Sequence, residues 1–183
     1  MQQKSIYKYA SEAGIPIGLY LTAMSACLLF SIRIPILQSM LMPLTLGFPI
    51  VLWFILRNIV RKEPAYSKFS TIWLGGIYSV IFGTLICLLL SGLYVVFIEP
   101  GFVGLYFQNA ISTIEQSPVA IEYADAISLM KEAMDANMLP SGMEFLSSMA
   151  WFTCFMGSIL SLFIALIMGR NRKKSTSQFG ITR

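Results

Sequence analysis

Residues 69–98 read FSTIWLGGIYSVIFGTLICLLLSGLYVVFI and contain no charged side chain. An apolar run of about 18 residues or more is long enough to cross the hydrocarbon core of a bilayer as a helix. Small residues recur within this run at every fourth position, namely Gly75, Ser79, Gly83, Cys87 and Ser91. Small residues along one side of a transmembrane helix let a neighbouring helix approach closely. The stretch therefore predicts a transmembrane helix with a small-residue face.

The composition of the whole chain also indicates the bilayer. Of its 183 residues, 56% are hydrophobic and 12% are charged, whereas a soluble domain carries about 25% charged residues. The absence of histidine removes the commonest general base and transition-metal ligand. Cys27, Cys87 and Cys154 lie far apart inside apolar runs, so we expect free thiols. The net charge is only +4 and its placement is that of a membrane protein, so we expect no nucleic acid partner.

Charged residues divide the chain into four uncharged stretches, each long enough to span a bilayer. A helix is the economical way across, because it satisfies every backbone polar group within the segment. The sequence therefore predicts a single integral membrane domain over residues 1–183, an all-α fold built as a four-helix transmembrane bundle. The expected spans are residues 13–32, 34–56, 70–98 and 145–169, with a helical hairpin over residues 99–144.

The basic residues predict the orientation of these spans. Eleven of the 13 Lys and Arg residues precede span one, link spans two and three, or follow span four. Because basic residues accumulate on the cytoplasmic side, we expect both termini in the cytoplasm. Segment 99–144 would then be extracytoplasmic, and it holds seven acidic residues against one base, Lys131.

Spans one and four also carry small residues at a four-residue spacing. The predicted packing positions are Gly14 and Gly18 in span one, Gly75, Ser79 and Gly83 in span three, and Gly157, Ser161, Ala165 and Gly169 in span four. Such faces are typical of close helix packing. They fit packing within this bundle, in a homo-oligomer or against a partner subunit, and the sequence does not choose among the three.

Span two differs because it contains Pro43, Gly47 and Pro49. A proline inside a helix removes one backbone donor and is expected to kink the helix. One interpretation is a broken helix beside a cavity, as in transporters. The other is a kink that neighbouring helices tolerate, and the small number of polar side chains nearby favours it.

Segment 99–144 predicts two helices. The first covers residues 102–114, and the second is expected to begin at Ser117 and Pro118, a hydroxyl cap followed by a proline. The second helix would be amphipathic and about 20 residues long, with a methionine-rich apolar stripe. Ser141 and Glu144 have the spacing of a capping box that opens span four. The apolar faces would cover the outer ends of the spans, lie at the lipid interface or form a partner-binding groove.

The sequence offers no catalytic, cofactor or metal site. Its spans hold no ionisable residues besides tyrosine and cysteine, although ion-coupled transporters place carboxylates or histidines at membrane depth. No glycine-rich phosphate loop occurs, and no serine or cysteine has a histidine to activate it. One pair is expected at the outer boundary: Arg33 and Glu99 would form an ion pair that locks the spans together, or Arg33 would hold a lipid phosphate.

Several features together carry a family resemblance. They are the basic link after span two, the exit Ile98-Glu99-Pro100-Gly101-Phe102 from span three, the methionine-rich acidic hairpin, and the small-residue span four with its basic tail. With these features the chain resembles an uncharacterised family of small bacterial inner-membrane proteins, catalogued as a domain of unknown function and common in Bacteroidota. Genes of that family often lie beside one for a membrane glycosyltransferase that uses polyprenyl-phosphate sugars. The resemblance implies a role in envelope glycan or lipid-carrier handling and supplies no catalytic residues.

Together these observations favour a non-enzymatic membrane protein that acts as an accessory or scaffold subunit. The expected partners are membrane lipid and either a second copy of the chain or another membrane protein, with a polyprenyl-phosphate glycosyltransferase as the candidate. The alternative is a small transporter or flippase for a lipid-linked or amphipathic substrate, which would use span two and Arg33.

Overall fold

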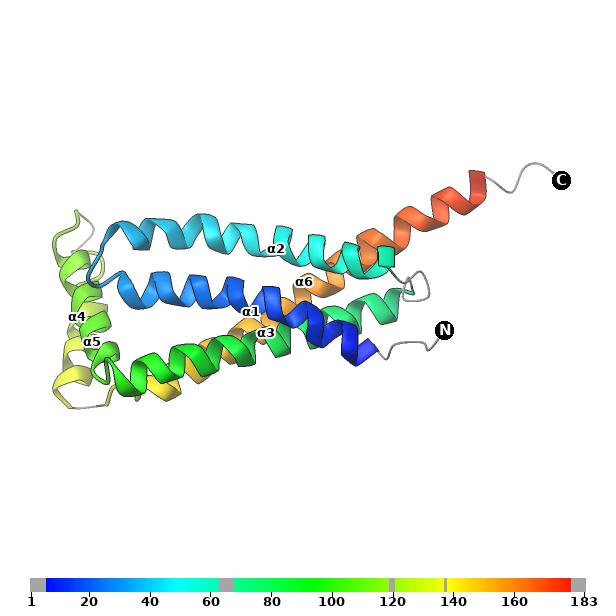
Figure 1. Cartoon of the computed structure of the whole chain (residues 1–183). Coiled ribbons are helices and arrows are strands. Elements are labelled where there is room, and N and C mark those ends of the chain that lie inside the picture. The colour runs from blue at the N-terminus through cyan, green and yellow to red at the C-terminus, as the bar shows by residue number, and fades with distance from the viewer. Residues whose placement is uncertain (1–5, 63–67, 119–120, 137, 179–183) are drawn as a thin grey trace.

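The structure is a computed structural model that describes residues 6–62, 68–118, 121–136 and 138–178, with residues 6–9, 62 and 169–178 described without their side chains. Within these ranges the chain forms six helices and no strand. Their bounds are α1 Ile6–Phe30, α2 Ile36–Lys62, α3 Phe69–Phe97, α4 Phe102–Glu115, α5 Ala124–Asp135 and α6 Gly142–Gln178. Figure 1 shows α1, α2, α3 and α6 running along one direction, with α4 and α5 lying across one end of them.

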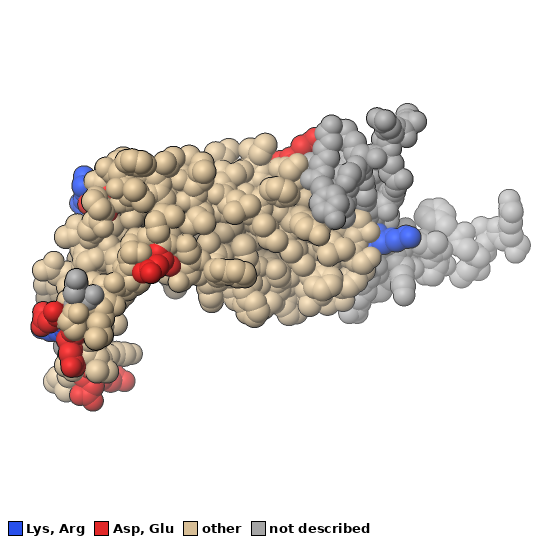
Figure 2. Space-filling model, turned by 90° about the horizontal axis from the view of Figure 1, so that it is seen from below, with Lys and Arg blue, Asp and Glu red and all other residues tan. Residues whose placement is uncertain are grey.

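Four of the helices are long and apolar enough to cross a membrane. The segments that qualify are Ala10–Phe30, Ile36–Arg61, Phe69–Phe97 and Gly142–Met168. Figure 2 shows a broad uncharged surface along the bundle, with acidic residues gathered at the end that carries α4 and α5. Large apolar side chains are exposed on all four helices, as expected where lipid is the solvent. The predicted all-α fold with four candidate spans is confirmed.

Two helices extend beyond their predicted spans, and one begins inside its predicted span. α1 begins at Ile6 rather than near residue 13, and α6 continues to Gln178 rather than ending near residue 169. An uncharged run marks where lipid can surround a helix, whereas backbone hydrogen bonding continues into the polar sequence beyond it. α2 instead begins later than predicted, at Ile36, because Pro35 disfavours helical backbone at Ile34.

α3 is the central helix, with α1 and α6 packed along it. Its contact with α1 depends on glycines from both helices. A Cβ added at Gly14 would lie 2.6 Å from the Cβ of Phe82. A Cβ added at Gly83 would lie 2.6 Å from Cγ2 of Ile17 and 3.0 Å from the backbone nitrogen of Gly18. These positions leave no room for a side chain, so the two backbones approach as closely as glycine permits.

The contact between α3 and α6 uses Gly76 rather than the predicted Gly75. A Cβ added at Gly76 would lie 2.5 Å from Oγ of Ser161, whereas one at Gly75 would have no neighbour within 4 Å. From the α6 side, a Cβ at Gly157 would lie 2.6 Å from Cγ1 of Val80. Three predicted packing residues have no exposed surface, namely Ser79, Ser161 and Ala165, and Gly169 lies beyond the residues whose surroundings are described.

α2 is one continuous helix that contains both Pro43 and Pro49. It is joined to α1 by Tyr20, whose hydroxyl donates a hydrogen bond to the carbonyl of Leu44. Gly47 makes room for this contact, because a Cβ there would lie 2.6 Å from the tyrosine hydroxyl oxygen. The glycine of the predicted kink segment therefore serves the close approach of a side chain from α1.

Two apolar clusters fill the bundle. The larger consists of Ile17, Leu21, Phe48, Leu52, Leu56, Val60, Ile72, Val80, Ile164 and Ala165, from the four long helices. The second, near α4, consists of Leu29, Val95, Phe102, Val103 and Leu146. Because the second cluster contains two residues of α4, this short helix is part of the core rather than a loose cover.

The second helix of the hairpin begins later than predicted. α4 covers Phe102–Glu115, close to expectation, but α5 begins only at Ala124 and has 12 residues. The hydroxyl of Ser117 donates to the carbonyl of Ile114 at 2.7 Å, so it serves the end of α4. The predicted start at Ser117 and Pro118 is therefore wrong, because a serine hydroxyl that can cap one helix can also bond back to the preceding turn.

The capping box at the start of α6 is confirmed. The backbone N–H of Ser141 donates to Oε2 of Glu144 at 2.8 Å, and the N–H of Glu144 donates to Oγ of Ser141 at 3.3 Å. This reciprocal pair satisfies two backbone donors where the helix begins. It fixes the point at which the chain returns from α5 into the bundle.

Candidate functional site

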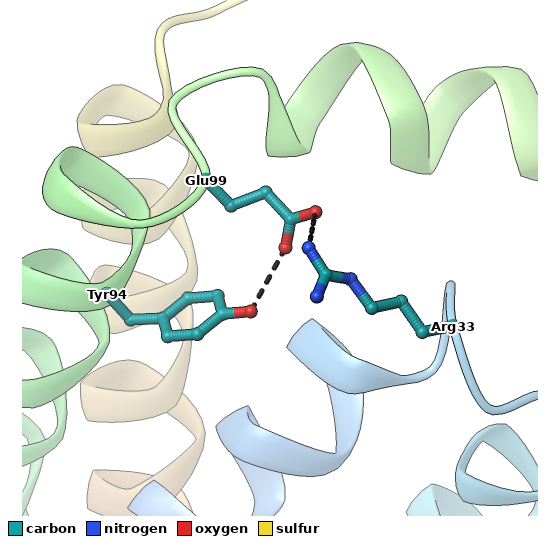
Figure 3. A network of polar contacts seen from close by, with 3 residues as sticks. All are labelled: Arg33, Tyr94 and Glu99. Atoms are coloured by element: carbon teal, nitrogen blue, oxygen red, sulfur yellow. Dashed lines mark hydrogen bonds and ion pairs between the residues drawn. The ribbon is translucent and has the colours of Figure 1, made fainter.

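Three polar side chains meet where the turn between α1 and α2 approaches the end of α3 (Figure 3). Nη2 of Arg33 lies 3.0 Å from Oε1 of Glu99. The hydroxyl of Tyr94 donates to Oε2 of the same carboxylate at 3.1 Å. The two residues that the sequence suggested as a pair are therefore in contact, and both oxygens of Glu99 accept a hydrogen bond.

Tyr94 is the member of this group that the sequence did not suggest. The chain folds back at the end of α3, where the N–H of Glu99 donates to the carbonyl of Tyr94 at 3.2 Å. That turn brings the carboxylate over the phenol of a residue five positions earlier. The ring of Phe30 packs edge-on against Tyr94, with centroids 5.3 Å apart. The last residue of α1 is thereby joined to the end of α3. The sequence signal that could have identified Tyr94 is its position about one turn before the acidic residue that follows α3.

The two charged side chains differ in exposure. The side chain of Arg33 is 62% exposed and that of Glu99 is 11% exposed. The hydrogen bond to Glu99 raises the pKa of Arg33, so the guanidinium stays charged at every accessible pH. A guanidinium has five N–H donors, and the Glu99 contact occupies one of them. Arg33 can therefore hold Glu99 and still offer donors to a lipid phosphate.

Aromatic side chains fix α4 against the start of α6. Phe102 is fully buried and stacks on Tyr106, with ring centroids 5.9 Å apart. The ring of Phe145, from α6, lies 6.3 Å from Phe102 and 6.0 Å from Tyr106. Aromatic rings at these separations contribute stability beyond the area that they bury. The first half of the hairpin is therefore held rigidly across the end of the bundle.

α5 is attached by fewer contacts. Its buried residue is Ile127. Nζ of Lys131 lies 2.7 Å from Oε1 of Glu115 on α4, and both side chains are about half exposed. An exposed ion pair contributes little to stability, so α5 depends mainly on the burial of Ile127 and lacks the aromatic contacts that hold α4.

The outward side of α5 and its flanks combines apolar and acidic side chains. We call the following seven residues the α5 surface: Ile121, Leu129, Met138, Glu122, Asp125, Glu132 and Asp135. All seven are exposed, and Ile121 is 90% exposed. The four acidic members form no ion pair with any described residue. Unpaired charge beside exposed apolar side chains is typical of an interaction surface.

The described residues contain no cluster of three or more His, Cys, Asp or Glu side chains that could hold a metal ion. Cys27, Cys87 and Cys154 are free thiols on three different helices. The Arg33 contact and the α5 surface lie at the same end of the bundle.

One family model matches the chain. Its description is a protein of unknown function (DUF4199), and it covers residues 12–170. The matched range begins in α1, ends in α6 and includes α4 and α5. No curated protein and no solved structure matches the chain.

Proposed function

We propose a function for this chain, which belongs to the DUF4199 family of proteins of unknown function. The chain acts as a non-enzymatic accessory or scaffold subunit of a membrane assembly, and the α5 surface contacts the partner. The observation that carries this proposal is a contrast within one hairpin. α4 is fixed by aromatic contacts around the buried Phe102, while α5 carries unpaired acids and exposed apolar side chains. A partner would meet these groups in a defined place at the end of the bundle.

In the proposed orientation, both termini lie in the cytoplasm and α4 and α5 lie outside a bacterial inner membrane. The distribution of basic residues supports it, because Lys and Arg accumulate on the cytoplasmic side. Arg57 and Arg61 lie near the end of α2 that is remote from α4 and α5. The basic residues before residue 10 and after residue 169 have no described side chains.

We assign the small-residue faces to the packing of this bundle rather than to a partner. The contacts of Gly14 and Gly83 between α1 and α3, and of Gly157 with Val80, support this assignment. Helices in lipid gain stability from close van der Waals contact, since lipid chains are as apolar as the helices. With these faces occupied, the α5 surface is the better candidate for the subunit contact.

The proposed partner is a membrane protein whose outer segment combines basic and apolar residues. Four unpaired carboxylates complement such a segment and steer its approach. They repel an identical α5 surface, so a second copy would not bind through this face. The family resemblance supports a partner in envelope glycan or lipid-carrier handling, and the proposed candidate is a polyprenyl-phosphate glycosyltransferase.

A transporter or flippase receives less support from the geometry. It would need a polar cavity beside Pro43 and Pro49, where Tyr20 packs against Leu44. The other residue that it would use, Arg33, pairs with Glu99 and keeps further donors for a lipid phosphate, so it does not decide between the two functions.

Purification from native membranes in mild detergent tests the scaffold proposal. The unmodified chain is expected to retain one partner in stoichiometric amount. The double variant Glu132→Gln, Asp135→Asn removes two charges at nearly constant volume and is expected to lose most of that partner. Leu46→Ala is the control, because Leu46 is an exposed apolar residue on the lipid-facing part of α2.

Equal recovery of the partner with both variants would contradict the assignment of the α5 surface. Recovery of the unmodified chain without a stoichiometric partner would contradict the scaffold function itself. The orientation is tested separately by reporter fusions after residues 130 and 183. The proposal requires the two reporters to lie on opposite sides of the membrane.

A further inference from the structure

The turn between α1 and α2 holds Arg33 at the edge of the membrane. α1 ends at Phe30 and α2 begins at Ile36, and both helices contain segments long and apolar enough to cross a bilayer. The turn itself cannot lie in the hydrocarbon core, because its backbone polar groups would face lipid without partners. Arg33 therefore lies at the level of the lipid headgroups, in the leaflet that borders α4 and α5 (Figure 1).

Glu99 fixes the orientation of the Arg33 guanidinium (Figure 3). Nη2 of Arg33 donates to Oε1 of Glu99 at 3.0 Å, and the hydroxyl of Tyr94 donates to the other carboxylate oxygen at 3.1 Å. The carboxylate is enclosed while most of the arginine side chain is exposed. A guanidinium has five N–H donors in one plane, and a phosphate can accept two of them at once. Its outer part is therefore accessible to a phosphate and already held in place.

Exposed apolar side chains flank this ion pair in the sequence. Ile34 and Ile36 follow Arg33, and Phe97 and Ile98 precede Glu99. All four side chains are exposed, and at the membrane edge their natural neighbours are acyl chains, which are equally apolar. A lipid whose phosphate meets Arg33 can therefore also place its chains against the protein, which free phosphate cannot do.

The other base at this end of the bundle is less suited to a lipid phosphate. Lys131 is the one base of segment 99–144, and its Nζ lies 2.7 Å from Oε1 of Glu115. An ammonium is a point charge without the planar pair of donors that a guanidinium offers. The part of α4 that follows Glu99 is uncharged, since the one acidic residue of α4, Glu115, lies at its opposite end. The start of α4 therefore does not repel an anion at Arg33.

We propose that Arg33 binds the phosphate group of a membrane lipid, whose acyl chains lie against the exposed apolar side chains of the turn and of the end of α3. Glu99 is a positioning residue that orients the guanidinium. A phosphate on the outer edge of the guanidinium is closer to the positive group than to the carboxylate, so attraction exceeds repulsion. The charge of Glu99 nevertheless weakens the contact. The inference is independent of the scaffold function and of the α5 surface.

The test measures lipid binding to the full chain by native mass spectrometry from a non-ionic detergent without phosphate. The ligands are palmitoyl-oleoyl phosphatidic acid and the diacylglycerol with the same chains, and inorganic phosphate is added as a competitor. We expect the phosphatidic acid to bind more tightly than the diacylglycerol and inorganic phosphate at the same concentration not to displace it. Arg33→Gln should raise the first dissociation constant of the phosphatidic acid about tenfold and change that of the diacylglycerol less than about twofold.

Two further variants separate phosphate binding from a purely structural role of the ion pair. Glu99→Gln keeps an oxygen that accepts from Arg33 and removes the negative charge, so it should tighten phosphatidic acid binding about threefold. If the pair only stabilised the fold, this variant would not bind the lipid more tightly. Lys131→Gln is the matched control, because it removes one positive charge at the same end of the bundle, and it should leave the dissociation constant within about twofold.

Four outcomes would overturn the proposal. They are equal binding of phosphatidic acid and diacylglycerol, a loss with Arg33→Gln no larger than with Lys131→Gln, no gain with Glu99→Gln, and displacement of the lipid by inorganic phosphate at equal concentration. The last outcome would assign the contact to free phosphate rather than to a lipid. If Arg33→Gln does not fold, Glu99→Gln decides, because the expected change is a gain of binding that a damaged fold would not produce.

Discussion

The central helix α3 and the end helix α5 are held in opposite ways. α3 is buried on the sides that meet α1 and α6, and glycines let the backbones touch. α5 has Ile127 as its buried residue and is joined to α4 by one exposed ion pair. In lipid, stability depends on close fit because the surroundings are equally apolar. At the end of the bundle a few aromatic and polar contacts suffice to hold α4, and they leave α5 exposed for other contacts.

The largest effect is expected at the glycine contact between α1 and α3. Gly83→Ala places a Cβ 3.0 Å from the backbone nitrogen of Gly18, which cannot move without shifting α1. We expect a loss of about 2 kcal/mol in the free energy of unfolding, as for other overpacked sites. Reversible unfolding by SDS in mixed micelles measures it.

The matched control for this prediction is Gly75→Ala on the same helix. An added Cβ there has no neighbour within 4 Å, and alanine favours helix over glycine by up to about 1 kcal/mol. Its stability should be unchanged or slightly higher. Equal losses for both variants would show that general helix effects, rather than the fit to α1, account for the change.

The contact of α2 with α1 should show a smaller effect. Tyr20→Phe removes the hydroxyl that donates to the carbonyl of Leu44 and is expected to cost about 1 kcal/mol. Gly47→Ala should cost at least as much, because its Cβ would displace the same hydroxyl. The same unfolding assay measures both. In the double variant the two losses of stability should not add. Additive losses would show that Gly47 contributes to stability independently of the Tyr20 hydrogen bond.

At the junction between the bundle and α4, we expect the effects of two substitutions on stability to be non-additive, whatever their magnitude. Arg33→Ala and Glu99→Ala should each lower the thermal midpoint in detergent, and the double variant should lower it by less than the sum. The reason is that each single change removes the same 3.0 Å contact. Tyr94→Phe should reduce the effect of Glu99→Ala in the same way, since its hydroxyl bonds the other carboxylate oxygen. Simple additivity would show that the group does not act as a unit.

The smallest effect is expected at α5. Lys131→Ala breaks the exposed ion pair with Glu115 and should cost about 0.5 kcal/mol or less. High salt should remove even this difference, because salt screens exposed charges. Amide hydrogen exchange of α5, measured at low and high salt, tests the prediction. A loss of stability as large as that expected for Gly83→Ala would contradict the conclusion that α5 is held more weakly than α3.

Part of this structure was predictable from local sequence. Charge boundaries predicted the four long helices, and the spacing of Ser141 and Glu144 predicted the capping box. Arg33 and Glu99 could be paired because both flank apolar runs at the same end of an antiparallel bundle. The start of α5 was not predictable, because Ser117 can bond forward as a cap or back to Ile114 with little difference in local energy.

The sequence by itself determined that the chain is all-α with four membrane-length apolar helices, since hydropathy and charge act over whole segments and need no partner. Tertiary structure decided which residues of each helix meet. It selected Gly76 over Gly75 for the contact with Ser161 and brought Tyr94 to the Arg33 pair. Periodicity identifies a helix face, but the angle and offset at which two helices cross decide which atoms on that face come into contact.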